Sequence, residues 1–192
     1  MKKVIAFIVL AISVFSGTSY AQNTKVEIDF MSLNTELETL DFDTTAIQFK
    51  LINPVNPSVD IEAVIAIGLS DDGYLVDFGF GDTLELTGEL SNMIGVFLKG
   101  HSSTGGNSEI YGRIGIAKVE YEFSVVETTG GFVTFSGSES ESDTGIAFGF
   151  GASFGISQES AITVEYNQLP DVDLGGLDLE TTSLSVGYQM SF

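Results

Sequence analysis

The most regular pattern in the chain is an alternation of large apolar and small polar residues near its C-terminal end. The apolar positions are Leu184, Val186, Tyr188, Met190 and Phe192. Successive side chains of a β-strand point to opposite faces, so this segment predicts a strand with one aliphatic and aromatic face. Residues 146–156 repeat the pattern, with mostly Phe and Ile on one face and Gly, Ala and Ser on the other.

The small residues opposite these apolar faces favour a barrel over a sandwich. In a soluble β-sandwich the second face would carry charged residues or threonines, whereas here it carries Gly, Ala and Ser. The interior of a narrow barrel needs small residues that leave room for a few large polar ones. The apolar faces would then lie on the outside of the barrel, against lipid.

Segments of this kind recur along the whole chain and predict eight antiparallel strands. The predicted ranges are 25–34, 43–53, 58–69, 84–98, 109–123, 144–156, 160–169 and 181–192. Most of them reach about the 9–11 residues that a tilted transmembrane strand needs. We therefore expect an all-β fold: an eight-stranded antiparallel up-and-down transmembrane β-barrel.

The connections between these segments alternate in length. The short ones are 53–57, 99–108 and 157–159, and the longer, acidic ones are 35–42, 70–83, 124–143 and 170–180. Short periplasmic turns and long outer loops are typical of an outer-membrane barrel with both termini in the periplasm. A soluble barrel of the lipocalin type would have polar residues outside and no reason for such alternation.

The N-terminal segment predicts export. A short basic region, Met1–Lys3, precedes an apolar run, Val4–Phe15, that is too short to span a bilayer as a helix. Small residues at Ser19 and Ala21 then form a signal-peptidase site. We expect residues 1–21 to be a removed signal peptide and residues 22–192 to be the barrel domain of a Gram-negative cell-envelope protein.

Composition excludes several classes of function. The formal net charge is −20, from 27 Asp and Glu against 7 Lys and Arg, so a nucleic-acid partner is not expected. There is no cysteine and only one histidine, which leaves no thiolate site and no usual zinc site. We expect no cofactor and no resident metal.

Four segments resemble one known family. Residues 55–62 (Val-Asn-Pro-Ser-Val-Asp-Ile-Glu) are similar to its first periplasmic turn, and residues 110–115 (Ile-Tyr-Gly-Arg-Ile-Gly) to its Tyr-x-Arg-Leu-Gly strand. Residues 162–166 (Ile-Thr-Val-Glu-Tyr) resemble its penultimate strand, and the alternating segment ending at Phe192 resembles its C-terminal signal. In this order they are similar to the OmpA-like eight-stranded outer-membrane β-barrels, which include small, porin-like members of the OmpX type.

The resemblance carries expectations about location and partners. It implies an integral protein of the bacterial outer membrane, in contact with membrane lipid and lipopolysaccharide and delivered by periplasmic chaperones. The C-terminal alternation would be the assembly signal that the barrel-assembly machinery reads. The resemblance also implies that Arg113 and Glu165 point into the lumen, while Thr163 stands where the family often has an inward arginine.

Strand parity by itself predicts which polar side chains face the interior. They are Lys50, Asp60, Glu62, Glu89, Tyr111, Arg113 and Glu165. A charge inside a narrow barrel is costly unless it is paired, so the two cations should lie among the carboxylates. Such a network could form a gated ion path with Arg113 at its gate, or a structural plug. We favour the plug because an eight-stranded interior is only just wide enough for side chains.

Acidic residues gather in the predicted loops. Candidates for a divalent-cation site are Asp71, Asp72, Glu139, Glu141 and Asp143. Carboxylate oxygens suit Ca²⁺ or Mg²⁺, but no segment has the spacing of a defined calcium loop. We favour solvated loops kept soluble by their charge.

The third predicted loop also contains apolar residues. They are Phe132, Val133 and Phe135, and they would extend a hairpin above the membrane and offer a strand edge to a partner. We therefore expect a non-enzymatic outer-membrane barrel with a structural or surface-interaction role and an extracellular partner at its acidic loops.

Two alternatives remain for the function. The acidic lumen suggests a small cation-preferring channel. A lipid-modifying enzyme ranks third, because such chemistry needs a histidine that activates a serine and the single histidine, His101, lies in a predicted periplasmic turn.

Overall fold

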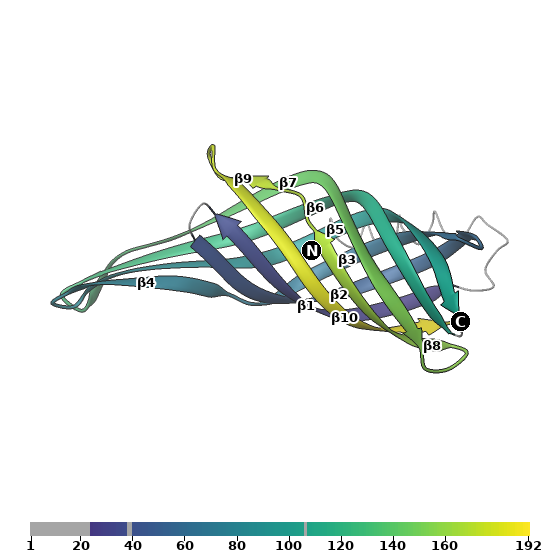
Figure 1. Ribbon diagram of the computed structural model, residues 1–192. Coiled ribbons are helices and arrows are strands. Elements are labelled where there is room, and N and C mark those ends of the chain that lie inside the picture. The colour runs from purple at the N-terminus through teal and green to yellow at the C-terminus, as the bar shows by residue number, and fades with distance from the viewer. Residues whose placement is uncertain (1–23, 38–39, 106) are drawn as a thin grey trace.

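The protein is seen in a computed structural model that describes residues 24–37, 40–105 and 107–192 (Figure 1). The predicted signal peptide, residues 1–21, lies outside the described residues. The strands are β1 (Lys25–Leu37), β2 (Leu40–Asn56), β3 (Val59–Ser70), β4 (Asp72–Gly79), β5 (Asp82–Gly105), β6 (Ser108–Thr129), β7 (Phe132–Gly155), β8 (Ser160–Gln168), β9 (Val172–Asp173) and β10 (Asp178–Ser191). The described part of the chain contains no helix long and apolar enough to cross a membrane.

Eight of these strands form a closed antiparallel ring. Their order is β1-β2-β3-β5-β6-β7-β8-β10, and β10 pairs back onto β1 from Lys25–Ser191 to Leu37–Leu179. Closure leaves no open sheet edge along the paired length of the wall, as a barrel in lipid requires. The predicted all-β fold with eight antiparallel strands is confirmed.

The two ends of the barrel differ. One end, which we call the turn end, carries the short connections β2–β3, β5–β6 and β7–β8. Phe192 lies at this end, where its backbone N–H donates to the carbonyl of Thr24 at 3.0 Å. The other end, the hairpin end, carries the β1–β2, β4–β5 and β6–β7 hairpins and the segment that contains β9.

A sheet projects from the hairpin end. β5 and β7 have 24 residues each and β6 has 22, against 9 for β8, so three neighbouring strands run far beyond the ring. β4 adds to the outer part of β5, and the four strands continue outward together (Figure 1, left). We call residues 72–90 and 119–145 the projecting sheet.

The predicted outer loops are therefore mostly strands. Residues 124–143 pair across β6 and β7 up to the Gly130–Gly131 turn, and residues 72–79 form β4. The expectation that 70–83 and 124–143 are loops is wrong, because each finds a neighbouring strand to pair with. The segment 99–108 is likewise almost entirely strand, with β5 ending at Gly105.

Aromatic contacts fix the base of the projecting sheet to the ring. The ring of Phe42, at the start of β2, packs edge-on against Tyr74 of β4 and Phe123 of β6. The Tyr74 hydroxyl accepts from the backbone N–H of Asp41 at 2.8 Å and donates to its carbonyl at 2.7 Å. The sheet is thus tied to β2 as well as continuous with β5, β6 and β7.

Inside the ring the side chains form two layers. The half toward the turn end is polar and charged, and the half toward the hairpin end is an apolar core. The outer surface exposes aliphatic and aromatic side chains, such as Ile114, Phe148 and Val186. This is the reverse of a soluble barrel and matches a wall that faces lipid.

Candidate functional site

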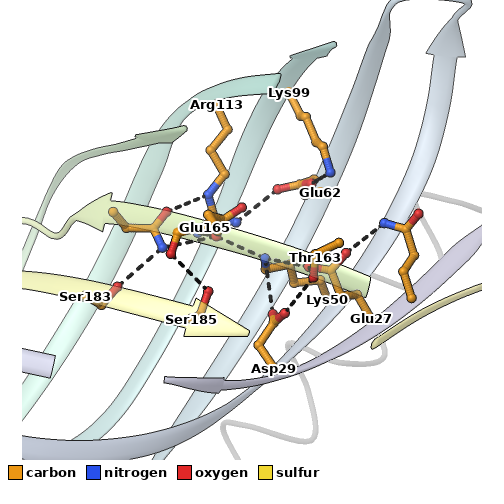
Figure 2. A network of polar contacts seen from close by, with 12 residues as sticks. Glu27, Asp29, Lys50, Glu62, Lys99, Arg113, Thr163, Glu165, Ser183 and Ser185 are labelled. Atoms are coloured by element: carbon orange, nitrogen blue, oxygen red, sulfur yellow. Dashed lines mark hydrogen bonds and ion pairs between the residues drawn. The ribbon is translucent and has the colours of Figure 1, made fainter. Parts of the chain in front are cut away.

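Lys50 is the centre of the polar layer. Its ammonium nitrogen lies 2.8 Å from Glu27 Oε1, 3.1 Å from Asp29 Oδ2 and 3.0 Å from Glu165 Oε1 (Figure 2). All four side chains are almost completely buried. A buried ammonium group loses its hydration, and three carboxylates around one Lys replace it.

Arg113 forms a second centre. Its Nη1 donates to Glu62 at 3.0 Å, its Nε donates to Asn167 Oδ1 at 3.0 Å, and its Nη2 lies 3.2 Å from Glu165. The guanidinium also lies over the ring of Phe97, 4.2 Å from its centroid. Glu165 therefore contacts both cationic centres and joins them into one network.

Lys99 closes the network on the other side of Glu62. Its Nζ lies 3.3 Å from Glu62 Oε1 and 3.8 Å from the centroid of the Tyr111 ring. Three cations, Lys50, Lys99 and Arg113, thus face four carboxylates, those of Glu27, Asp29, Glu62 and Glu165. Near balance of charge and short contacts are the properties of a structural plug.

Six of the seven predicted lumen residues do point inward. Lys50, Asp60, Glu62, Tyr111, Arg113 and Glu165 are all buried. Glu89 does not join them and was wrongly predicted. Ser91 is an extra residue between the Leu90–Tyr121 and Asn92–Glu120 pairs, and this bulge reverses the parity of β5 beyond it. Leu90 takes the inward position instead.

Several members of the network lie outside the set of residues that strand parity predicts. Glu27 and Asp29 face inward on β1, and Lys99 does so on β5, beyond the predicted end of that strand. Thr163 and Gln189 donate to Glu27, at 3.2 Å and 2.7 Å. The alternation Glu27-x-Asp29 is the signal for β1 in the sequence, whereas Lys99 follows directly after the predicted strand 84–98 and falls in a predicted short connection.

The apolar layer lies directly beyond this network. Its largest fully buried side chains include Met31, Leu33, Leu90 and Met93, and Leu169 and Val172 close it at the hairpin end. Tyr121 contributes a ring to this layer and donates its hydroxyl to Thr181 at 2.6 Å. The lumen is thus filled by two successive layers, one of ion pairs and one of packed apolar side chains.

His101 lies at the turn end, in β5 rather than in a solvated turn. Its side chain is 12% exposed, with Nε2 3.6 Å from Asp60 and Nδ1 3.7 Å from Glu109. The imidazole therefore has carboxylates on both sides. The described residues give no hydrogen bond from a serine hydroxyl to this ring.

The candidate cation ligands lie in two separate parts of the chain: Asp71 just before β4 and Asp72 at its start, and Glu139, Glu141 and Asp143 on β7. Asp72 accepts from the backbone N–H groups of Asp43 and Gly73, each at 2.8 Å. Glu139, Glu141 and Asp143 follow one another on the same face of β7. Within the described ranges no group of three or more His, Cys, Asp or Glu is close enough to hold a metal ion. Divalent-cation binding stays a prediction.

A family model decides which protein family this fold represents. The model of the outer membrane protein beta-barrel domain matches residues 7–192. The chain belongs to this family. Family membership places this outer membrane β-barrel protein in the bacterial outer membrane. No curated protein sequence matches the chain.

Solved structures show the same fold at low sequence identity. The outer membrane protein OprG from Pseudomonas aeruginosa is 11% identical, with a TM-score of 0.55 over 90% of this chain and 97% of that one. Neisserial surface protein A is 13% identical, with a TM-score of 0.53 over 88% and 97%. Ail of Yersinia pestis, solved with a heparin analogue, is 14% identical, with a TM-score of 0.52 over 88% and 98%.

The alternating C-terminal residues lie on the outer wall of this β-barrel. Leu184, Val186, Tyr188, Met190 and Phe192 are all exposed on β10 or at its end. Their place on the lipid-facing side, next to the β1–β10 seam, suits an assembly signal. That role stays a prediction.

Proposed function

We propose that this outer membrane β-barrel protein anchors a surface-interaction module and performs no enzymatic reaction. The observation that carries the proposal is the projecting sheet. It continues past the barrel and exposes large apolar side chains, among them Phe78, Phe80, Phe132 and Phe135. A protein gains nothing in its own stability from apolar side chains left in water, and exposed apolar patches mark interaction sites.

The lumen supports an anchor rather than a channel. A permeating ion would have to pass between the carboxylates of Glu27 and Glu165 and then cross the apolar layer at Leu90 and Met93. An ion in apolar surroundings without a partner is strongly disfavoured. The cation-channel alternative therefore has the acidic polar layer in its favour and the apolar layer against it.

We further propose that the hairpin end faces outward and the turn end faces the periplasm. The chain has no cysteine, so single introduced cysteines report their side of the membrane. Ser140→Cys in the projecting sheet should react with a membrane-impermeant maleimide in intact cells. Gln158→Cys in the β7–β8 turn should react only after the outer membrane is permeabilised. The opposite labelling would overturn this orientation.

The interaction role is tested by shortening the sheet. Replacing residues 74–86 and 125–137 each by a two-glycine turn leaves the Gly73–Thr87 and Ser124–Ser138 pairs to close the hairpins. Cells that carry this variant at the parent's outer-membrane level should attach less to protein-coated surfaces. Equal attachment by the two strains would overturn the proposed role.

A further inference from the structure

The projecting sheet has two unlike faces. Side chains of directly paired residues lie on the same face of a sheet. Successive pairings therefore form rows of four residues across β4, β5, β6 and β7. Two rows lie on one face: Val76–Leu84–Glu127–Phe135 and Tyr74–Leu86–Val125–Gly137. Two rows lie on the other face: Leu75–Glu85–Val126–Ser136 and Gly73–Thr87–Ser124–Ser138. The first face is mostly apolar and the second mostly polar.

The apolar side is open to solvent. Val76 and Phe135 are 45% and 55% exposed, while the side chains between them are half-buried. We call this set the apolar face, and it consists of Val76, Leu84, Leu86, Val125 and Phe135. The apolar face continues the inward-facing side of β5 and β6 outward from Leu90 and Tyr121. Beyond these two residues, none of the described ring strands packs over the apolar face.

The charge around this face has a single sign. Residues 70–90 contain six acidic residues, residues 119–145 contain six more, and neither segment contains Lys, Arg or His. Glu127 lies within the apolar face itself, and Glu139 follows on the same face of β7. Such a surface attracts cations and repels sulfated sugars, nucleic acids, anionic lipid and a second copy of itself.

We propose that the apolar face binds a cationic, amphipathic polypeptide segment, and this inference rests on the proposed surface-interaction role. The apolar side chains of the segment would pack on Val76, Leu84 and Phe135. Its Lys or Arg side chains would reach Glu127, Glu139 and the other carboxylates at the rim. Apolar contact supplies the affinity, and charge complementarity supplies the selection of partner and the rate of association.

The binding test uses the mature barrel in nanodiscs of zwitterionic lipid, with empty nanodiscs as the blank. The probe is a short fluorescent peptide of alternating Lys and Val. The parent should bind it, and binding should weaken as salt is raised. Peptides of alternating Lys and Ser, or of Glu and Val, should bind at least about tenfold more weakly, since each lacks one of the two contributions.

Matched variants separate the two faces. Val76→Ser with Phe135→Ser removes apolar side chains from the apolar face and should weaken Lys-Val binding at least about tenfold. Leu75→Ser with Val133→Ser also replaces two apolar residues by serine, at two 65% exposed positions of the opposite face, and should leave binding within about twofold. Heat-modifiability on a gel checks that all variants are folded barrels.

Each outcome decides one question. Equal binding by the parent and the Val76→Ser, Phe135→Ser variant overturns the proposal, and so does equal binding of the Lys-Ser peptide. Binding of zwitterionic vesicles by the parent but not by that variant would make lipid the occupant and would also overturn it. If no peptide binds while the shortened sheet still loses attachment, the interaction role stands and only the chemistry of the partner is wrong.

Discussion

The ammonium of Lys50 lies 3.0 Å from a carboxylate oxygen of Glu165, although β2 and β8 are separated in the barrel wall by β1 and β10. The contact therefore crosses the lumen and joins strands that share no backbone pairing. Because Glu165 also lies 3.2 Å from Arg113 of β6, a single carboxylate connects three strands. Ion pairs inside the ring thus connect strands that are not neighbours in the wall.

Loss of Lys50 should lower the stability of the barrel. Lys50→Met removes the cation and leaves Glu27, Asp29 and Glu165 as neighbouring buried carboxylates, which should lower the free energy of unfolding by about 3–5 kcal/mol. Urea unfolding in micelles, followed by loss of heat-modifiability, measures this change. Lys118→Met is the matched control, because Lys118 is half-exposed and 3.8 Å from Glu120, so its loss should cost about 0–1 kcal/mol. Equal losses would show that the buried network carries no special stability.

Gly187 should tolerate no side chain. It faces the lumen beside Asp29 and Thr163, and a methyl group there would overlap both side-chain oxygens. Gly187→Ala should therefore displace Asp29 from Lys50 and reduce the folded fraction on a gel. Gly112→Ala is the control, since the nearest atom to its added carbon is 3.8 Å away. A Gly187→Ala barrel as stable as the parent would mean that the network has room to shift.

The apolar layer should block ions even without the ion pairs. We expect no steady conductance from the parent in planar bilayers, and none from Arg113→Ala, because Leu90 and Met93 still fill the lumen. Adding Leu90→Gly and Met93→Gly to Arg113→Ala should open a conducting path in barrels that remain heat-modifiable. Steady conductance from the folded Arg113→Ala single variant would instead place the barrier at the ion pairs.

Phe192 should matter for assembly. Deleting it should lower the outer-membrane level, because the strand that ends there pairs with β1 to close the ring, and unpaired backbone groups in lipid cost several kcal/mol each. Phe192→Tyr keeps an aromatic ring at the interface and should assemble far better. Quantitative blotting of membrane fractions measures both. A deletion variant at the parent's level would reduce Phe192 to an ordinary interface aromatic.

Local pattern was enough for the wall of the barrel. A period of two places Leu184 and Val186 outside and Ser185 and Gly187 inside, whatever the rest of the chain does. The same parity put Lys50, Arg113 and Glu165 inside. It failed at Glu89, because the bulge at Ser91 depends on how β5 pairs with β6 rather than on the residues of β5 alone.

Alternation along the chain predicts the eight strands, their lipid-facing surface and most of the charges inside the barrel, because it depends only on neighbouring residues. Which charges meet depends on the fold, since Lys50 and Glu165 are 115 residues apart and come together through ring closure and strand tilt. The strand structure of residues 124–143 also depends on the fold. Their acidic, serine-rich sequence resembles a solvated loop, and they become part of a sheet because β5 pairs with the outer part of β6 and β6 pairs with the outer part of β7.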